Sequence, residues 1–141
     1  MSHSATTVYM GSHKSNIIEV DSWVASPSTF KAGMCGHLKS DGTVSLANSD
    51  GSKIGISLGR SLSDIGRTSF ARKGKGVPIL LANGFTPTVG AQVQISTTTG
   101  LAVSSGTAVN AFYATSTLTA YDEDGVVIAD GAALIDFVGG L

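Results

Sequence analysis

The sequence predicts a single all-β domain of the sandwich or barrel type, and three observations predict it. Apolar and polar residues alternate over short runs, turn-forming pairs fall between these runs, and no segment carries the apolar stripe of a helix. Glycine, serine and threonine supply 51 of the 141 residues (18, 19 and 14), which favours strands and turns over helices. A chain of this length can bury one core without disulfides or metals.

The chain begins with a polar, irregular stretch, so we expect an N-terminal arm over residues 1–15 and one domain over residues 16–141. Tyr9 lies in this arm and is an expected interface residue. We expect the arm to become ordered only when the protein is bound to a partner.

The first strand is expected at residues 16–24, with Val20 and Val24 on its apolar face. Trp23 then shares the polar face with Glu19 and Asp21. A lone tryptophan on a polar face often anchors an interface. Two interpretations stay open: Trp23 is such an anchor, or a loop of the same subunit covers it.

Two hairpins are expected further along the chain. The first pairs residues 43–47 with 53–58, and the second pairs 91–96 with 101–105 across the turn TTTG. Turn-forming Asp-Gly and Asn-Gly pairs tolerate the positive φ of tight turns, and they occur at 41–42, 50–51, 83–84, 124–125 and 130–131.

Charge is scarce and unevenly distributed. Only 13% of the residues are charged, about half the usual share of roughly 25%. Five of the nine basic residues lie in 60–75 and five of the ten acidic ones in 122–136, whereas residues 76–121 carry no charge. The two charged regions are expected to be complementary interface surfaces, formed by Arg67, Arg72, Lys73, Lys75, Asp122, Glu123 and Asp124.

The basic stretch FARKGKGVPILLANG at residues 70–84 resembles a phosphate-binding loop only superficially. Its glycines do not fit the G-x-x-x-x-G-K-[ST] spacing, and a strand-like VPILLA follows where a helix is needed. Only Phe70 accompanies the basic residues, whereas nucleic-acid clamps use several aromatic platforms. We therefore expect a flexible basic loop here, preceded over residues 61–72 by a loop or one short helix.

No catalytic or metal site is expected. Cys35 and His37 lack an orienting third group and further ligands, so we interpret them as a buried inert cysteine beside a surface histidine. Asp122-Glu-Asp-Gly lacks the rest of a calcium loop and is interpreted as an acidic hairpin turn. No cofactor is expected.

Partners and compartment follow from the overall charge and the first residues. A net charge of −1 gives no bulk attraction for nucleic acid or anionic membrane. The stretch MSHSATTVYMG lacks a signal peptide, no apolar run spans a bilayer, and the single cysteine excludes an intrachain disulfide. We therefore expect synthesis in a cytosol.

Three stretches resemble the small capsid cement, or decoration, proteins of tailed bacteriophages. They are GHLKSDGTVSLANSDGSKIGISLGRSL, VGAQVQISTTTGLAVSSGTAVNAFYATSTL and DGVVIADGAALIDFVGGL, within residues 30–141. The resemblance implies an all-β, often jelly-roll-like fold on the outside of an icosahedral shell. It implies contact with the major capsid protein and with other copies of the chain, and it carries no catalytic residues.

A structural role also suits the composition, because a ligand that binds only the assembled shell stabilises it. The alternative is a small carbohydrate- or cell-surface-binding module of the fibre or lectin type. Such a module would expose aromatic side chains around a pocket, and the candidates are Tyr9, Trp23, Phe85 and Tyr113. An enzyme is not expected, because no acid–base or nucleophile set is visible.

Overall fold

The computed structural model describes residues 16–25, 30–46, 53–62, 67–122 and 124–138. These residues form strands, turns and loops without a helix, which confirms the all-β prediction. The strands are β1 (Asn16–Val24), β2 (Cys35–Leu38), β3 (Val44–Ser45), β4 (Lys53–Leu62), β5 (Arg67–Leu80), β6 (Gln92–Ile95), β7 (Ala102–Val103), β8 (Thr107–Tyr113) and β9 (Ala132–Phe137).

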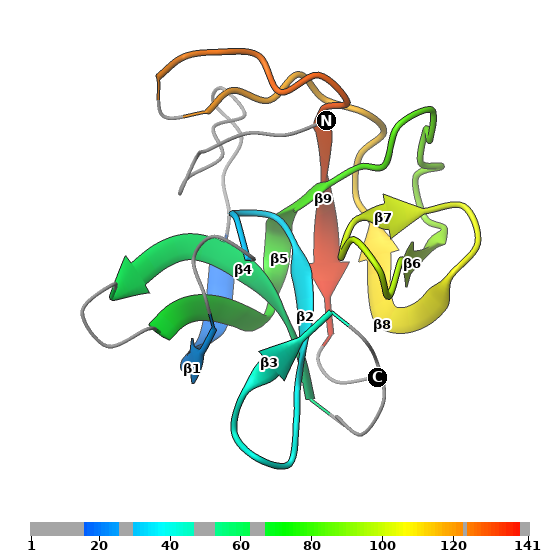
Figure 1. Cartoon of the computed structure of the whole chain (residues 1–141). Coiled ribbons are helices and arrows are strands. Elements are labelled where there is room, and N and C mark those ends of the chain that lie inside the picture. Colours follow the sequence, from blue (N-terminus) through cyan, green and yellow to red (C-terminus); the bar gives the residue numbers. More distant parts are fainter. Residues whose placement is uncertain (1–15, 26–29, 47–52, 63–66, 123, 139–141) are drawn as a thin grey trace.

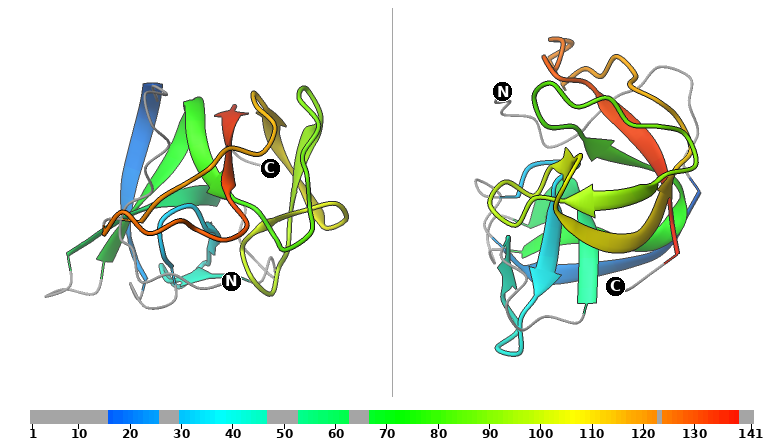
Figure 2. Two further views of the ribbon diagram at one scale, coloured as in Figure 1. Left: turned by 90° about the horizontal axis from the view of Figure 1, so that it is seen from above. Right: turned by 90° about the vertical axis from the view of Figure 1, so that its right-hand side faces the viewer.

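The nine strands of the described residues form one curled antiparallel sheet, a half-barrel (Figure 1). Its order is β3-β2-β4-β5-β9-β8-β6-β7, and β1 pairs with β5 beside this path. Seen from above, β5, β9, β8 and β6 follow one another along an arc (Figure 2). The barrel-type expectation is therefore confirmed as one continuous sheet, which differs from the two stacked sheets of a jelly roll.

The long strand β5 divides the sheet, because it changes partner halfway along. On one edge it pairs with β4 from Arg67 to Ala71 and then with β9 from Gly74 to Leu80, whereas β1 pairs along the other edge from Arg67 to Lys75. Its register shifts against β1 between Glu19 and Val20 and against β9 between Gly74 and Val77. A β-bulge reverses the face to which later side chains point.

The predicted loops over 61–72 and around RKGKG are corrected by this strand. Ser61 and Leu62 end β4, residues 63–66 lie outside the described residues, and residues 67–80 are β5. The bulges break the alternation from which a strand is recognised in a sequence, since Ala71, Gly74 and Val77 are all buried at a spacing of three.

Three apolar clusters hold the fold together. The largest fills the half-barrel with side chains from β2, β4, β5, β6, β8 and β9, among them Ile54, Ile79, Val93 and Ile135. A second cluster lies under residues 114–131, the segment between β8 and β9 that we name the excursion, and contains Leu80, Ile128 and Leu134. The third is aromatic and lies on the other face of β4 and β5.

The aromatic cluster consists of Trp23, Phe30 and Phe70 with Ala25. The Trp23 and Phe70 rings stack with centroids 5.0 Å apart, and Phe30 meets Phe70 edge-on at 5.4 Å. Two glycines that face each other in the β2–β4 pair, Gly36 and Gly55, leave the room for these rings. A Cβ on Gly55 would lie 2.8 Å from the Phe70 Cβ and 3.1 Å from the Trp23 ring.

The curl is held at one end by the turn between β6 and β7. The Cys35 amide donates to the Gly100 carbonyl at 2.8 Å, and the Ala82 amide donates to the Ala102 carbonyl at 2.9 Å. Gly100 has a φ of +71°, and a Cβ there would lie 2.8 Å from the Cys35 carbonyl oxygen. Only glycine adopts this positive φ readily and leaves room for the Cys35 carbonyl oxygen. Gly100 therefore allows the turn at the far edge of the sheet to contact β2.

The two predicted hairpins have different outcomes. The 91–105 hairpin is confirmed, since β6 pairs with β7 and Val93 and Ile95 are fully buried. The pairing of 43–47 with 53–58 is wrong, because β2 lies between β3 and β4 and pairs with both. Positive φ angles confirm the turns at Gly42, Gly84, Gly125 and Gly131, and the pair at 50–51 lies outside the described residues.

The predicted arm, residues 1–15, lies outside the described residues, together with Tyr9.

Candidate functional site

The four basic residues predicted to form one interface separate into two pairs. Arg67 donates through Nε to the Ser22 hydroxyl at 3.2 Å and through a second nitrogen to the Ser22 carbonyl, so it connects β5 to β1. Arg72 is 17% exposed in its side chain and lies 3.2 Å from Asp21 and 3.6 Å from Glu19. Both arginines therefore contact β1 of their own subunit.

Lys73 and Lys75 make up the second pair and are exposed on β5. Neither lies within 4 Å of a carboxylate among the described residues. Gly74 between them is buried, and the register shift before Val77 returns the strand to the core. A basic contact surface thus stays a prediction for Lys73 and Lys75. The two arginines are engaged within the subunit, which does not favour this role for them.

An open groove lies between β5 and the C-terminal end of β9, and we name it the fork groove. It has a volume of about 200 Å³, is almost entirely apolar, and is lined by Lys73, Gly74, Lys75, Asp136, Phe137 and Val138. The lysine stems supply apolar wall while their charged ends reach water. Val138 is 52% exposed at the end of β9. Phe112, 41% exposed, pairs with Asp136 on the neighbouring strand β8 and extends the apolar surface.

Asp122 builds the turn that the sequence predicts in the acidic region. Its carboxylate oxygen Oδ1 accepts hydrogen bonds from the Asp124 and Val126 amides, each at 2.9 Å. The Asp122 amide donates to the Val126 carbonyl at 2.9 Å, and Gly125 takes a φ of +78°. The acidic hairpin turn is therefore confirmed, while Glu123 lies outside the described residues.

The acidic tip, defined as residues 121–122 and 124–127, exposes apolar side chains as well as carboxylates. Tyr121, Val126 and Val127 are 38%, 59% and 56% exposed. This apolar component was not predicted from the sequence, although the dipeptide Val126-Val127 directly after the turn is its signal. Two buried residues below, Ala120 and Ile128, hold the tip on the domain, and the Ile128 amide donates to the Ala120 carbonyl at 2.8 Å.

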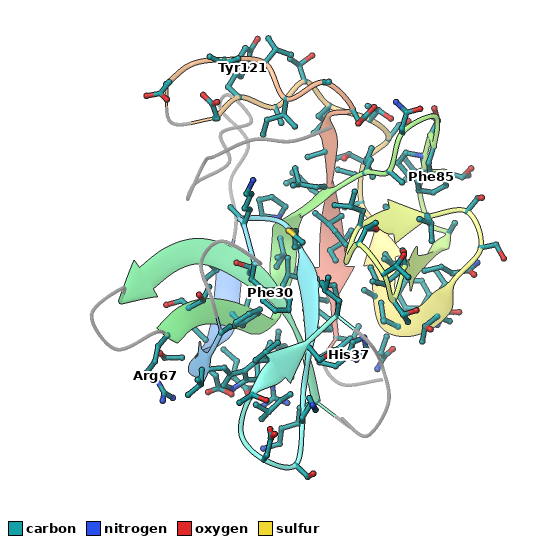
Figure 3. The ribbon with its side chains drawn as sticks, viewed as in Figure 1. Phe30, His37, Arg67, Phe85 and Tyr121 are labelled. Carbon is teal, nitrogen blue, oxygen red and sulfur yellow. The ribbon has the colours of Figure 1, made fainter. Side chains whose placement is uncertain are left out.

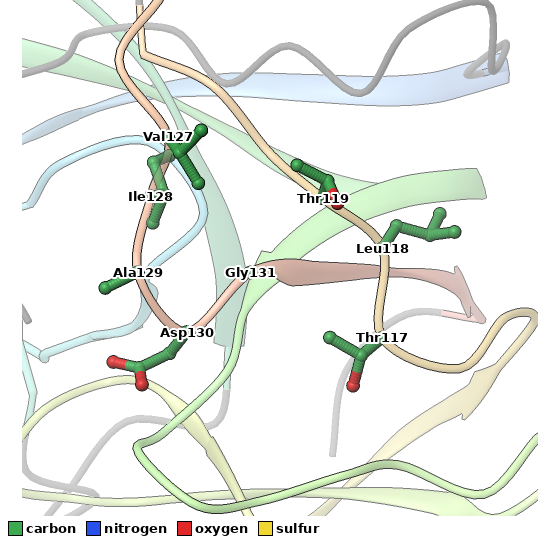
Figure 4. Close-up of a pocket in the computed structure, with 8 residues that line it drawn as sticks. All are labelled: Thr117, Leu118, Thr119, Val127, Ile128, Ala129, Asp130 and Gly131. Atoms are coloured by element: carbon green, nitrogen blue, oxygen red, sulfur yellow. The ribbon is translucent and has the colours of Figure 1, made fainter.

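A second pocket lies at the base of the tip, between the two limbs of the excursion (Figure 4). It has a volume of about 170 Å³ and is lined by Thr117, Leu118, Thr119, Val127, Ile128, Ala129, Asp130 and Gly131. One carboxylate oxygen of Asp130 accepts a hydrogen bond from the Asn83 amide at 3.1 Å. The pocket has no second charged side chain, so it offers no acid–base pair.

Tip and groove lie at opposite ends of β9. The excursion enters β9 at Ala132, and the groove begins at Asp136 near its other end. Figure 1 shows the excursion at one end of the molecule and the β9 arrow pointing away from it. In Figure 3, Tyr121 lies on the excursion, whereas Arg67 and His37 lie toward the opposite end.

Trp23 is not an exposed interface anchor, which corrects the first of its two interpretations. It is only 6% exposed, within the aromatic cluster, and Arg72 lies over its ring at 5.8 Å from the centroid. The predicted faces of this strand are reversed, since Val20 and Val24 are 51% and 42% exposed. Val20 and Val24 share one face and Trp23 lies on the other, as predicted, but the face of Trp23 is the buried one because its ring stacks on Phe70.

Cys35 and His37 both point into the half-barrel from β2 and are fully buried. Burial raises the pKa of the Cys35 thiol to about 12, which leaves it protonated and inert, as expected. The prediction of a surface histidine is wrong. Neither ring nitrogen of His37 has a hydrogen-bond partner among the described residues, and desolvation lowers the pKa of His37 below the ordinary 6.5.

The described residues contain neither a metal-ion site nor a membrane-spanning helix. No three histidine, cysteine, aspartate or glutamate side chains gather as a metal-ion site within them. They also contain no helix of the length and apolarity that a bilayer crossing requires.

Comparison with known proteins gives no match to a family model, to a curated protein or to a solved structure.

Proposed function

We propose that this chain is a structural cement protein that binds the outside of an icosahedral phage capsid and bridges its subunits. The observation that carries the proposal is the division of exposed apolar side chains into separate surfaces of one small domain. Val20 and Val24 lie on β1, Val126 and Val127 on the acidic tip, and Val138 beside the fork groove. Several contact surfaces on one subunit suit a protein that is surrounded by others.

The shell-facing surface in this proposal is β1. Among the described strands β1 pairs only with β5, apart from one bridge between Val24 and Thr43. Its outer edge and its two exposed valines are therefore open to a partner, and a free edge can pair with a strand of another protein. The partner in this proposal is the major capsid protein.

The function follows from mass action. A protein that binds only the assembled shell stabilises it by about 2.7 kcal/mol per site when its free concentration is 100 times its Kd. Individually weak contacts act together when their sites are arrayed on a lattice. The chain would be made in the host cytoplasm, would act on the capsid exterior, and would carry out no chemical reaction.

Burial of the aromatic residues weighs against the carbohydrate-binding alternative. Trp23 and Tyr113 are 6% and 3% exposed, and Phe85 packs against the core with its ring 6.1 Å from that of Tyr113. Tyr9 lies outside the described residues. Two exposed aromatics, Phe112 and Tyr121, belong to different surfaces and form no common sugar platform.

The experiment uses heads of the phage whose genome carries this coding sequence. The heads are produced after the coding sequence has been deleted, so they lack the chain. Adding the purified chain should raise the temperature at which the heads release DNA, read with a DNA-binding dye. The variant Val20→Ser/Val24→Ser should raise it less, because the shell-facing apolar surface is reduced.

Val89→Ser is the matched control, since Val89 is 60% exposed on none of these surfaces and its loss should change nothing. Heads whose DNA-release temperature does not respond to the parent chain contradict the proposal.

A further inference from the structure

The acidic tip and the fork groove are complementary in three respects, and we propose that the tip of one copy docks in the groove of another. The tip presents apolar side chains beside carboxylates. The groove presents an apolar floor beside two lysines and one carboxylate, Asp136, which accepts a hydrogen bond from the Gly76 amide. The inference deepens the proposed function and rests on it for its setting, since it names how neighbouring copies on a shell would contact each other.

The first respect is size and polarity. The groove volume of about 200 Å³ exceeds the roughly 150 Å³ that accepts a benzene ring in an engineered cavity. It therefore has room for one aliphatic or aromatic side chain of the tip. Val126 and Val127 are each more than half exposed, so burying them in the groove removes apolar surface from water.

The second respect is charge. Lys73 and Lys75 have no carboxylate within 4 Å among the described residues, and the tip carries Asp122 and Asp124. Asp124 is exposed and makes no side-chain hydrogen bond within the described part of the chain. Exposed pairs each contribute only about 0–1 kcal/mol, so these charges would set the register of docking more than its strength.

The third respect is rigidity. Four hydrogen bonds of Asp122 hold the turn, since its carboxylate accepts two, its carbonyl accepts one and its amide donates one. Ala120 and Ile128 anchor the turn from below. The groove is built on paired strands, with the Asp136 carboxylate accepting from the Gly76 amide at 3.3 Å. The described residues of both surfaces are therefore held in place before docking, which lowers the entropic cost of association.

The position of the two surfaces decides that the contact is between molecules. They lie at opposite ends of β9, whose six residues span roughly 20 Å at the usual rise per residue. A tip therefore cannot reach the groove of its own subunit. Contact between two different surfaces is heterologous, so the copies join head to tail into a closed ring or an open chain.

Engineered cysteines test this contact in solution, without shells. Val127→Cys and Val138→Cys are made in separate chains, mixed and oxidised mildly, and the disulfide-linked dimer is measured on a non-reducing gel. Docking raises the effective concentration of the two thiols, so this dimer should form at least about tenfold faster than in a control mixture of Val127→Cys and Val89→Cys. The native Cys35 stays in place because it is buried and protonated.

Charge reversal tests the register. Lys75→Glu in the Val138→Cys chain, or Asp124→Lys in the Val127→Cys chain, should each lower the cross-linking rate, and the two together should restore it. Lys53→Glu is the matched control, since Lys53 is exposed on β4 and does not line the groove. Circular dichroism confirms that each variant is folded.

Three outcomes would overturn the inference. One is a cross-linking rate equal to the Val89→Cys control, and another is a rate that both charge reversals leave unchanged. The third is binding of a 20-nucleotide oligothymidylate that Lys75→Glu abolishes while cross-linking stays at background, which would make the groove a nucleic-acid site. The cross-linking experiment contains no shell, so its failure does not affect the DNA-release result for the proposed function. Failure of the DNA-release experiment likewise does not affect the cross-linking result.

Discussion

Gly55→Ala is expected to destabilise the protein, because the aromatic cluster occupies the space that a side chain would need. A Cβ at this position would lie 2.8 Å from the Phe70 Cβ, and ordinary contact begins at 3.4 Å. Phe70 would therefore have to move by 0.6 Å. Its Cβ is bonded to the backbone of β5, which β1 and β4 hold on both edges, so this neighbour cannot turn aside.

The magnitude follows from two opposing effects. Inserting a methyl group into a packed core costs typically 1–3 kcal/mol, roughly. Replacing glycine by alanine also restricts the unfolded chain, which returns about 0.4–1 kcal/mol. We expect a net loss of about 1–2 kcal/mol, or a few degrees in Tm for a domain of this size.

Trp23 makes the assay specific, because it is the sole tryptophan of the chain and belongs to the cluster. Urea unfolding followed by its fluorescence should give a lower midpoint for Gly55→Ala than for the parent. Gly36→Ala provides the comparison. A Cβ on Gly36 would meet the ends of the Val44 and Phe30 side chains at 2.5 and 2.7 Å, and these ends can rotate away. A Gly55→Ala variant as stable as the parent, or less affected than Gly36→Ala, would refute the reasoning.

Three further predictions concern buried and partly buried polar groups. The pKa of His37 is lowered in the folded state, so the unfolded state binds this proton more readily. The free energy of unfolding should therefore fall as pH drops below about 6.5. Urea titrations at several pH values should show this fall, and His37→Leu should flatten it. Cys35 should resist a thiol reagent at pH 8 in the native protein and react in urea, and rapid native labelling would contradict its burial. Arg72→Gln should cost about 1–2 kcal/mol through lost contacts with Asp21 and the Trp23 ring, and a red shift of the Trp23 emission should accompany it.

The strands that could be predicted are those whose apolar alternation is uninterrupted. β6 buries every second residue, and Ile54 and Ile56 of β4 alternate into the core. The turns with Asp-Gly or Asn-Gly adopt the expected positive φ where they are described. β2 escaped prediction because Cys35-Gly36-His37 shows no apolar alternation. Its two faces are nevertheless both buried, since Gly36 admits an aromatic cover.

The candidate site was only partly predictable for a related reason. Lys73 and Lys75 point outward from β5, whose pairing is interrupted by bulges. These bulges break the apolar alternation from which a strand would be predicted at this position. On β1 the face of Trp23 is buried under Phe70 and Arg72, and the face of Val20 is exposed, so the predicted interface residue and the exposed one exchange places. The engagement of Arg67 and Arg72 by β1 depends on a pairing between residues more than 40 positions apart, which no local pattern reveals.

The central claim is that the chain belongs to a virion, and its sedimentation tests this most directly. A lysate of cells producing the phage that carries this coding sequence is separated on a sucrose gradient, and the chain is detected by antibody across the fractions. The account predicts that the chain sediments with DNA-filled icosahedral particles and is released when their shells are dissociated. A chain found only in the slow fractions with free proteins, while the particles sediment without it, would contradict the account.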